Sequence, residues 1–233
     1  LAAGPQPEAR TSAAPAAYRG TLVLNGTELD TADLPSAPSQ DLIPLRLLAE
    51  ADHGAASWDQ ETNSSRFYLE GCVVTVDCAT GAVTVDGSPA EGTAQIRAGV
   101  TFVPAAVLDK LEGYSVTLDR GTERIDIATP NGDPMIQLLY QLADTAGMGH
   151  SMKVSAAELE EYKYLSSGVI TRGCGLLPMM TSPETAILCR AAEGKLDQLK
   201  AELETYRKNQ EDTFSWYLSQ NLPKVQNAQT VVS

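Results

Sequence analysis

Two segments of this chain repeat one another sixty residues apart, and they align without a gap. The first copy spans residues 41–62 and the second spans residues 101–122. Both carry a proline after two apolar residues and close with an Asp-x-x-Thr sequence. A shorter echo precedes each copy, at residues 22–26 and 83–87. A repeat of this kind predicts two copies of one structural unit, so it constrains the fold more than any other feature of the sequence.

The first copy predicts a strand, a helix and a hairpin, in that order. Residues 42–43 form a short apolar strand, and Pro44 can begin a helix because its missing N–H is not needed at the first helical position. The His-Gly pair at 53–54 ends that helix, and a hairpin follows over residues 55–69. The Asn-Gly pair at 25–26 predicts a tight hairpin ahead of the copy.

The second copy predicts the same elements, with a strand ending at Val103 and a helix over residues 104–111. Its hairpin strands are predicted over residues 115–118 and 124–128. The segment between the copies predicts one further hairpin, over residues 72–86. Units of this type give an α+β domain with antiparallel pairing.

A turn-rich segment at residues 129–134 marks the start of a second domain. Asp133 can cap a helix that has Pro134 at its first position, and Gly147 stops this helix. Residues 155–158 form a capping-box sequence, which predicts that a second, short helix begins there.

One long amphipathic helix is predicted after Gly194, because apolar side chains recur there every three or four residues. The side chains expected to pack one face of this helix against a small sheet are Leu196, Leu199, Leu203, Tyr206 and Tyr217. The sheet is predicted from the segments near Val169, Ile187 and Val231, with a last strand over residues 227–232.

The predicted organisation is a linker or tether over residues 1–17, a repeat domain over residues 18–130 and a second domain over residues 131–233. The fold class is α+β. The first domain is expected to be a tandem strand–helix–hairpin repeat with an antiparallel sheet. The second is expected to be a small sheet packed by one long helix and shorter helices.

The net charge of the chain is −13 at pH 7, and most of it lies in the first domain. Residues 1–130 hold 8 Lys and Arg against 18 Asp and Glu, whereas residues 131–233 hold 9 against 12. A surface this acidic repels phosphate backbones, so no nucleic-acid partner is predicted. No run of about 18 apolar residues predicts a transmembrane span. Residues 1–4 resemble the end of a signal peptide or lipobox, which predicts export and a lipid anchor at the N-terminus.

The sequence predicts no catalytic, cofactor-binding or metal-binding set. Copper favours imidazole ligands, but the two histidines, His53 and His150, fall in different predicted domains. The nucleophile, zinc-protease and phosphate-binding motifs do not occur in the sequence. We therefore expect a protein that is not an enzyme and that purifies without stoichiometric copper or zinc.

Two groups of acidic residues are interpreted as solvated surface. Glu158, Glu160 and Glu161 fall on a short exposed helix, whereas acid–base catalysis would need one of them to be buried. Asp30 and Asp33 could contact calcium, but their spacing matches no known calcium loop.

The four cysteines are expected to be free and buried. Cys72 and Cys78 lie in one predicted strand, which separates them by about 20 Å, whereas a disulfide needs Cα atoms within about 7 Å. Cys174 and Cys189 flank a loop and could face each other on neighbouring strands. Export favours oxidation of thiols to disulfides, so a disulfide between Cys174 and Cys189 is the alternative to free thiols.

Several short sequences of the first copy carry a resemblance to a known family: Asn-Gly at 25–26, Ile-Pro-Leu-Arg at 43–46, Gly54 and Trp-Asp at 58–59. Together they resemble the copper amine oxidase N-terminal-domain-like family, over about residues 18–130. The resemblance implies a non-catalytic module of secreted and cell-wall proteins of Gram-positive bacteria. The second copy departs from the pattern, because an Ala-Ala pair replaces Leu-Arg and a leucine replaces the tryptophan.

The second domain resembles an uncharacterised family of secreted or lipid-anchored proteins of similar bacteria, described only as a domain of unknown function. The strand at 184–188, the Gly-Lys turn at 194–195 and the helix over 199–217 carry this resemblance, and the Asn-Ala pair at 227–228 also fits. Neither resemblance implies a catalytic residue.

These features predict a non-catalytic protein that is extracellular or at the cell surface, with a binding or scaffolding role in the bacterial envelope. A cell-wall polymer or a surface protein would be its partner. The alternatives are an envelope-acting hydrolase with an unrecognised site and a purely structural spacer.

Overall fold

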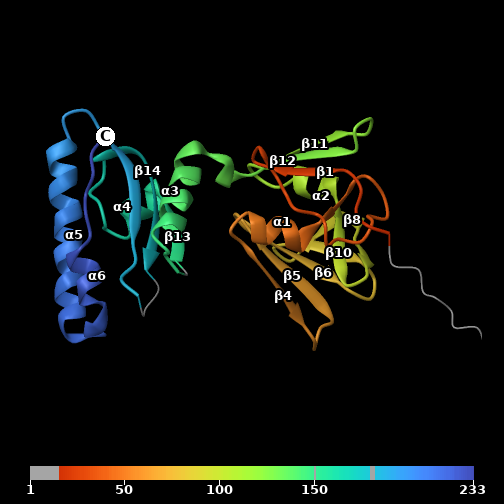
Figure 1. Cartoon of the computed structure of the whole chain (residues 1–233), viewed down its shortest axis with the longest axis horizontal. Helices are drawn as coiled ribbons and strands as arrows, with labels where there is room; N and C mark the ends of the chain where they lie inside the picture. Colours follow the sequence, from red (N-terminus) through yellow and green to blue (C-terminus); the bar gives the residue numbers. More distant parts are fainter. Residues whose placement is uncertain (1–15, 150, 179–181) are drawn as a thin grey trace, which may run out of the picture. The chain divides into compact units, whose positions relative to one another are not determined.

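The computed structural model describes residues 16–149, 151–178 and 182–233. These residues form two compact units, which divide after Gly132. Each unit combines helices with sheets that are mostly antiparallel (Figure 1), so the predicted α+β class is confirmed. The tether predicted over residues 1–17 falls almost entirely outside the described residues.

The first unit consists of short strands and two short helices. In chain order its elements are β1 (Thr21–Leu24), β2 (Thr27–Glu28), β3 (Leu42–Pro44), α1 (Leu45–Ala51), β4 (Ala55–Asp59), β5 (Ser64–Leu69), β6 (Cys72–Asp77), β7 (Ala82–Val85), β8 (Ser88–Thr93), β9 (Gln95–Arg97), β10 (Val100–Pro104), α2 (Ala105–Asp109), β11 (Ser115–Asp119), β12 (Arg124–Ala128) and the 3-10 turn η1 (Pro130–Gly132). The predicted order of strand, helix and hairpin is therefore present in both copies, as β3-α1-β4-β5 and β10-α2-β11-β12.

The two copies meet where β3 pairs with β10. These strands run antiparallel, and Ile43 lies opposite Val103, its equivalent in the second copy. Both side chains are 0% exposed and belong to one hydrophobic cluster. Because equivalent residues pair with each other, the two copies are related by a local two-fold axis, as in a symmetric dimer interface. The repeat therefore forms one domain around one shared core.

Each larger sheet of the first unit combines strands from both copies. One sheet has the order β11-β12-β1-β2 and the other has the order β4-β5-β6-β7-β8. β6 is inserted between β5 and β7 and is antiparallel to both. No strand is inserted between β12 and β1, and these two run parallel. This pair is the exception to the antiparallel pairing that the sequence predicted.

Two tight turns confirm that the short echo is structural. Asn25 and Gly26 have φ angles of 49° and 84°, and Asp86 and Gly87 have φ angles of 48° and 80°. Two successive residues in the left-handed region define a type I′ turn, which matches the twist of a hairpin. The turns join β1 to β2 and β7 to β8.

The repeated Asp-x-x-Thr sequence builds the same turn in both copies. Asp59 Oδ1 accepts from the backbone N–H of Thr62 at 3.3 Å and of Glu61 at 2.9 Å. Asp119 Oδ1 accepts from Thr122 at 3.3 Å and from Gly121 at 2.9 Å. Hydrogen bonds from the two threonines lower the pKa of both carboxyl groups, which favours the ionised form that accepts these bonds.

A buried polar network joins the start and the end of the first unit. Asn25 Nδ2 donates to Thr129 Oγ1 at 3.0 Å, and the Thr129 backbone N–H donates to Asn25 Oδ1 at 2.9 Å. Thr129 Oγ1 in turn donates to Asp52 Oδ1 at 3.0 Å. Asn131 Nδ2 donates to the backbone carbonyl of Asp52, also at 3.0 Å. Asp52 and Asn131 are 5% and 1% exposed, so these bonds form in a region of low dielectric, where each missing partner is costly.

The second unit contains one three-stranded sheet and four α-helices among its described residues. In chain order its elements are α3 (Pro134–Thr145), β13 (Ser151–Ser155), α4 (Ala156–Glu161), β14 (Ile170–Pro178), β15 (Ala186–Ala191), α5 (Leu196–Trp216), η2 (Ser219–Asn221) and α6 (Leu222–Gln226). The predicted helix starts are confirmed. Asp133 caps α3 by accepting from Met135 N at 2.8 Å, and Ser155 forms the capping box of α4 with Glu158.

Helices cover both faces of the antiparallel sheet β13-β14-β15. Leu139 of α3 packs with Leu176 on one face, and Leu199 of α5 packs with Leu177 on the other, together with α4. Successive strand residues point to opposite faces, which is why the adjacent leucines of β14 serve two different clusters. Figure 1 shows α3 on one side of the sheet and α5 on the other.

The buried stripe predicted for the long helix is only partly correct. Leu199 is 4% exposed, but Leu196 and Tyr217 are each 40% exposed, and Phe214 is buried instead at 5%. Leu199 packs in the cluster beside the sheet, whereas further along the helix α5 lies beside α6, whose Gln226 bonds to Glu211. The predicted last strand is also wrong. Residues 227–232 form no strand, and Val231 is 83% exposed.

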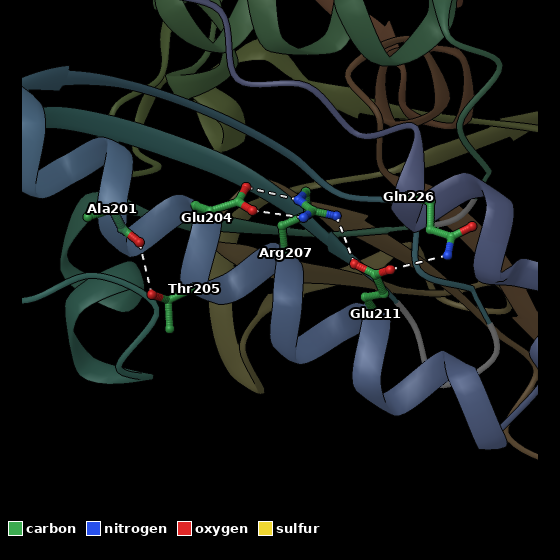
Figure 2. Close-up of polar contacts among 6 residues, drawn as sticks. All are labelled: Ala201, Glu204, Thr205, Arg207, Glu211 and Gln226. Carbon is green, nitrogen blue, oxygen red and sulfur yellow. Dashed lines mark hydrogen bonds and ion pairs between the residues drawn. The ribbon is translucent and has the colours of Figure 1, made fainter.

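A polar network explains why α6 lies beside α5. Arg207 donates to both carboxylate oxygens of Glu204, at 2.9 and 2.7 Å, and to Glu211 at 3.0 Å. Gln226 of α6 donates to the other oxygen of Glu211 at 3.1 Å (Figure 2). The contact with Glu204 raises the pKa of the Arg207 guanidinium, and the side chain of Arg207 is 24% exposed. The chain after α5 is thus held as a helix beside α5.

The polar network predicts that Thr129 stabilises the first unit through its hydroxyl group. Thr129→Val keeps the shape of the side chain but removes the donor to Asp52 and the acceptor for Asn25, so we expect a loss of about 1–3 kcal/mol in the free energy of unfolding. Urea denaturation followed by circular dichroism measures this loss. Thr117→Val, at an exposed position of β11, is the matched control and should change stability by less than about 0.5 kcal/mol. Equal effects of the two substitutions would contradict the role of the network.

The burial observed along α5 predicts a large loss of stability on truncating one leucine of this helix and a small loss on truncating another. Leu199→Ala removes a side chain from the cluster between α5 and the sheet, and it should cost about 2–5 kcal/mol. Leu196→Ala, three residues earlier and 40% exposed, should cost less than about 1 kcal/mol. Denaturant titration of both variants measures the difference, and a larger loss for Leu196→Ala would restore the stripe that the sequence predicted.

Candidate functional site

The histidines are not brought together as a metal site. His53 is exposed and follows α1 with a φ of 64°, while His150 lies outside the described residues. Over residues 16–149, 151–178 and 182–233, no group of three or more His, Cys, Asp and Glu could hold a metal ion.

Three of the five acidic residues considered from the sequence build turns and helix ends, and the other two, Asp33 and Glu161, are exposed. Glu158 accepts from the Ser155 backbone N–H at 2.7 Å, and Glu160 accepts from Gly168 N at 3.4 Å. Asp30 accepts from the Ala32 backbone N–H at 3.0 Å, which closes its own turn. These three carboxylates therefore have local structural partners.

All four cysteines are free thiols. Cys174 packs in the cluster beneath α3, whereas Cys189 packs in the cluster beneath α5, so these two lie on opposite faces of the sheet. The interpretation that they face each other is wrong, because Gly173, not Cys174, pairs with Cys189. Burial, together with the nearby charge of Asp86, raises the pKa of Cys72 to about 11, which disfavours the reactive thiolate at neutral pH.

The first copy exposes an aromatic side chain on the face of its hairpin that points toward the core. Trp58 lies two residues after Ala56, which packs against the core, so both side chains point to the same side of β4. The tryptophan is nevertheless 56% exposed. Figure 1 shows the β4–β5 hairpin extending away from α1. Trp58 therefore lies on the core-facing side of the hairpin, but at a position where the core does not cover the sheet.

The second copy packs the equivalent position. Leu118 lies opposite Ile125 with the same register that places Trp58 opposite Ser65. Ile125 is 4% exposed, and Leu118 packs against the core cluster with it. β1 lies beside β12 and places Leu22 next to Ile125. In the first copy a small serine stands at the isoleucine position, so the tryptophan has no comparable apolar partner across the hairpin.

Amide side chains lie in the turn next to the exposed tryptophan. Gln60 and Asn63 are exposed residues of the turn that joins the two strands. Asp59 and Arg66 are paired at 3.5 Å but lie on the other face of the hairpin, because Asp59 directly follows Trp58 and Arg66 lies opposite Ser57. An aromatic ring near amide groups can contact a ligand through its apolar face and orient it by hydrogen bonds. We call Trp58, Gln60 and Asn63 the hairpin-tip surface.

The second unit has an open groove of about 520 Å³ beside α5. Tyr164 and Tyr206 meet there edge to face, with ring centroids 5.3 Å apart. Glu202 also lines the groove. Burial of Glu202 raises its pKa, but hydrogen bonds from the backbone N–H of Ser166, at 2.8 Å, and from Gln198 outweigh this effect and lower it. Glu202 therefore stays ionised and braces the loop before β14, which does not suit it to act as a general acid.

The hairpin-tip surface was not predicted from the sequence as a site. The available signal was the substitution of leucine for tryptophan between two copies that align without a gap. That difference becomes informative only when the structure shows which of the two side chains is packed. Among the described helices, none is long and apolar enough to cross a bilayer.

Comparisons with known proteins bear on the first unit. Searches among curated proteins and among solved structures find no match. A family model does match, over residues 23–127, and these residues include the hairpin-tip surface and both copies of the repeat. The matching family is a non-catalytic module. Residues 23–127 are thus identified as similar to the copper amine oxidase N-terminal domain, as the sequence predicted for this part of the chain.

Proposed function

We propose that this protein is a non-catalytic binding protein of the bacterial envelope, exported to the cell surface, whose first domain contacts a cell-wall polymer. The observation that carries the proposal is the exposure of Trp58 at a position where the second copy has a packed leucine. The match of residues 23–127 to a non-catalytic module supports a role in binding rather than catalysis. The proposed location follows from the resemblance of both domains to secreted or cell-surface proteins of Gram-positive bacteria.

The chemistry of the hairpin-tip surface favours the glycan part of such a polymer. A tryptophan ring offers a large, rigid apolar surface at a low cost in conformational entropy, and the C–H faces of sugar rings can lie against it. The amide groups of Gln60 and Asn63 can bond to sugar hydroxyls. The net charge of −13 disfavours anionic partners and has little effect on an uncharged sugar.

The alternatives differ in what the protein does to the wall. A spacer would hold the second domain away from the wall without recognising the wall polymer. A hydrolase would release soluble fragments, and its site would be expected in a pocket with titratable groups of perturbed pKa. The groove of the second unit does not favour this alternative, because Glu202 has a lowered pKa and is engaged with Ser166. The second domain, which resembles an uncharacterised family, is proposed to have a scaffolding role.

The proposal predicts that Trp58→Leu weakens binding to the wall without affecting folding. This substitution gives the first copy the residue that the second copy has. Loss of a central aromatic contact typically costs 2 kcal/mol or more, so we expect at least about tenfold weaker binding. Co-sedimentation of the protein with purified peptidoglycan sacculi, over a range of sacculus concentrations, measures the change.

Trp216→Leu is the matched control, because Trp216 is the other tryptophan of the chain and is 77% exposed in the second unit. This variant should bind as the wild type does. Failure of the wild-type protein to sediment with sacculi would favour the spacer, and release of soluble wall fragments would favour the hydrolase. Equal binding by wild type and Trp58→Leu would refute the role of the hairpin-tip surface.

A further inference from the structure

A second polar site lies in the first unit, in a cavity of about 250 Å³ beside the hairpin of the second copy. Three segments line it: Tyr18 and Arg19, residues 36–40, and part of the β11–β12 hairpin that includes Arg120. In the first copy, the strand beside the equivalent hairpin is β6 rather than β1. The cavity is therefore a product of the asymmetry between the copies.

Backbone hydrogen bonds fix the walls of this cavity. Tyr18 N donates to the carbonyl of Leu34 at 2.9 Å, and Ala17 forms a β-bridge with Pro35. Thr21 N donates to the carbonyl of Glu123 at 2.9 Å, which holds the start of β1 against β12. These bonds bring together segments that lie far apart in the sequence, so the cavity is formed by the fold itself.

The close approach of the first wall to the hairpin depends on Gly20. Its φ is +96°, a conformation that favours glycine, and a Cβ at this position would lie 2.2 Å from the carbonyl oxygen of Glu123. Residues 18–19 can therefore lie next to β12 only because a glycine follows them.

The acidic groups that line the cavity already have partners. Asp119 accepts from the backbone of its own turn, at 2.9 Å from Gly121 N. Glu123 accepts from Gln40 Nε2 at 3.1 Å. One basic group of the lining, Arg124, is paired with Asp126 through two bonds of 2.7 Å each. The charge of Arg124 is thus neutralised, whereas Asp119 and Glu123 are hydrogen-bonded to neutral donors and keep their charge.

Arg19 and Arg120 differ from these groups, because neither makes a hydrogen bond or ion pair with any residue in the described part of the chain. Both are exposed residues that line the cavity. The first domain is strongly acidic overall, so two arginines without an acidic partner at one cavity are a local source of positive charge, which Asp119 and Glu123 partly offset. A guanidinium group presents a planar fork of donors that matches a carboxylate.

We infer that this cavity binds a small ligand with a single carboxylate group, which Arg19 and Arg120 recognise. A highly charged polyanion fits less well, because Asp119 and Glu123 also line the cavity and would repel it. Tyr18, Pro38 and Leu118 supply an aromatic and apolar wall beside the arginines. The volume suits a ligand the size of one or two amino acids, below the range typical of drug-sized ligands. The free carboxyl end of a short peptide has this chemistry.

Isothermal titration calorimetry with the full chain tests this inference. The probes are N-acetyl-alanyl-alanine with a free carboxylate, the same dipeptide with a C-terminal amide, and inorganic phosphate. The free acid should bind, and the amide should bind at least about tenfold more weakly, since it removes the charge that the arginines recognise. Arg120→Gln and Arg19→Gln should each weaken binding of the free acid by about tenfold or more. Glutamine stands at position 60, which is equivalent to position 120.

Arg46→Gln is the matched control for the loss of one positive charge. Arg46 is exposed, lies outside the cavity and pairs with Glu50 at 3.7 Å on α1, so its substitution should change the affinity by less than about twofold. Equal binding of acid and amide, no effect of either cavity variant, or no binding of the acid at millimolar concentration would overturn the inference. Binding of phosphate but not of the acid would overturn the assignment of the ligand as a carboxylate. These outcomes do not depend on binding to sacculi, so this test can fail independently of the proposed function.

Discussion

The pairing of Ile43 with Val103 is the contact on which the first domain depends. Because each residue faces its own equivalent, the two copies of the repeat form one shared core instead of two separate ones. Neither copy could bury its helix and its hairpin alone. The same two-fold relation places the hairpin of each copy in a sheet with the leading hairpin of the other. The polar network between Asn25, Asp52 and Thr129 then fixes the two ends of the domain to each other.

The departures from this two-fold relation are where the domain acquires its candidate sites. The inserted strand β6 changes the partner of the first hairpin, and the tip of that hairpin keeps Trp58 exposed opposite a serine. In the second copy, β1 and the segment before it lie beside the hairpin, which buries Ile125 and encloses the cavity lined by Arg19 and Arg120. One copy therefore presents an open aromatic surface and the other a small cavity lined by two arginines that are unpaired among the described residues, although the two copies share one sequence pattern.

The features that the sequence predicted correctly are local ones. The Asn-Gly turn, the capping box at Ser155 and the Asp-x-x-Thr turns each depend on contacts within a few residues. The parallel pairing of β1 with β12 could not be predicted, since it joins segments more than a hundred residues apart and depends on where β6 is inserted. The apolar spacing along α5 did not show which turns the sheet covers, so the burial predicted for Leu196 and Tyr217 is wrong. The exposure of Trp58 likewise depends on its tertiary partner and not on its own sequence.

The contact proposed between the wall polymer and the first domain is made at Trp58. Fluorescence of a Trp216→Phe variant tests it most directly, because Trp58 is then the only tryptophan in the chain. An indole that is 56% exposed should shift its emission to shorter wavelength, and become less accessible to acrylamide, when soluble peptidoglycan fragments bind over it. In a Trp58→Phe variant, the emission of Trp216 should stay unchanged. A shift of Trp216 with no change at Trp58 would contradict the account and place the contact in the second domain.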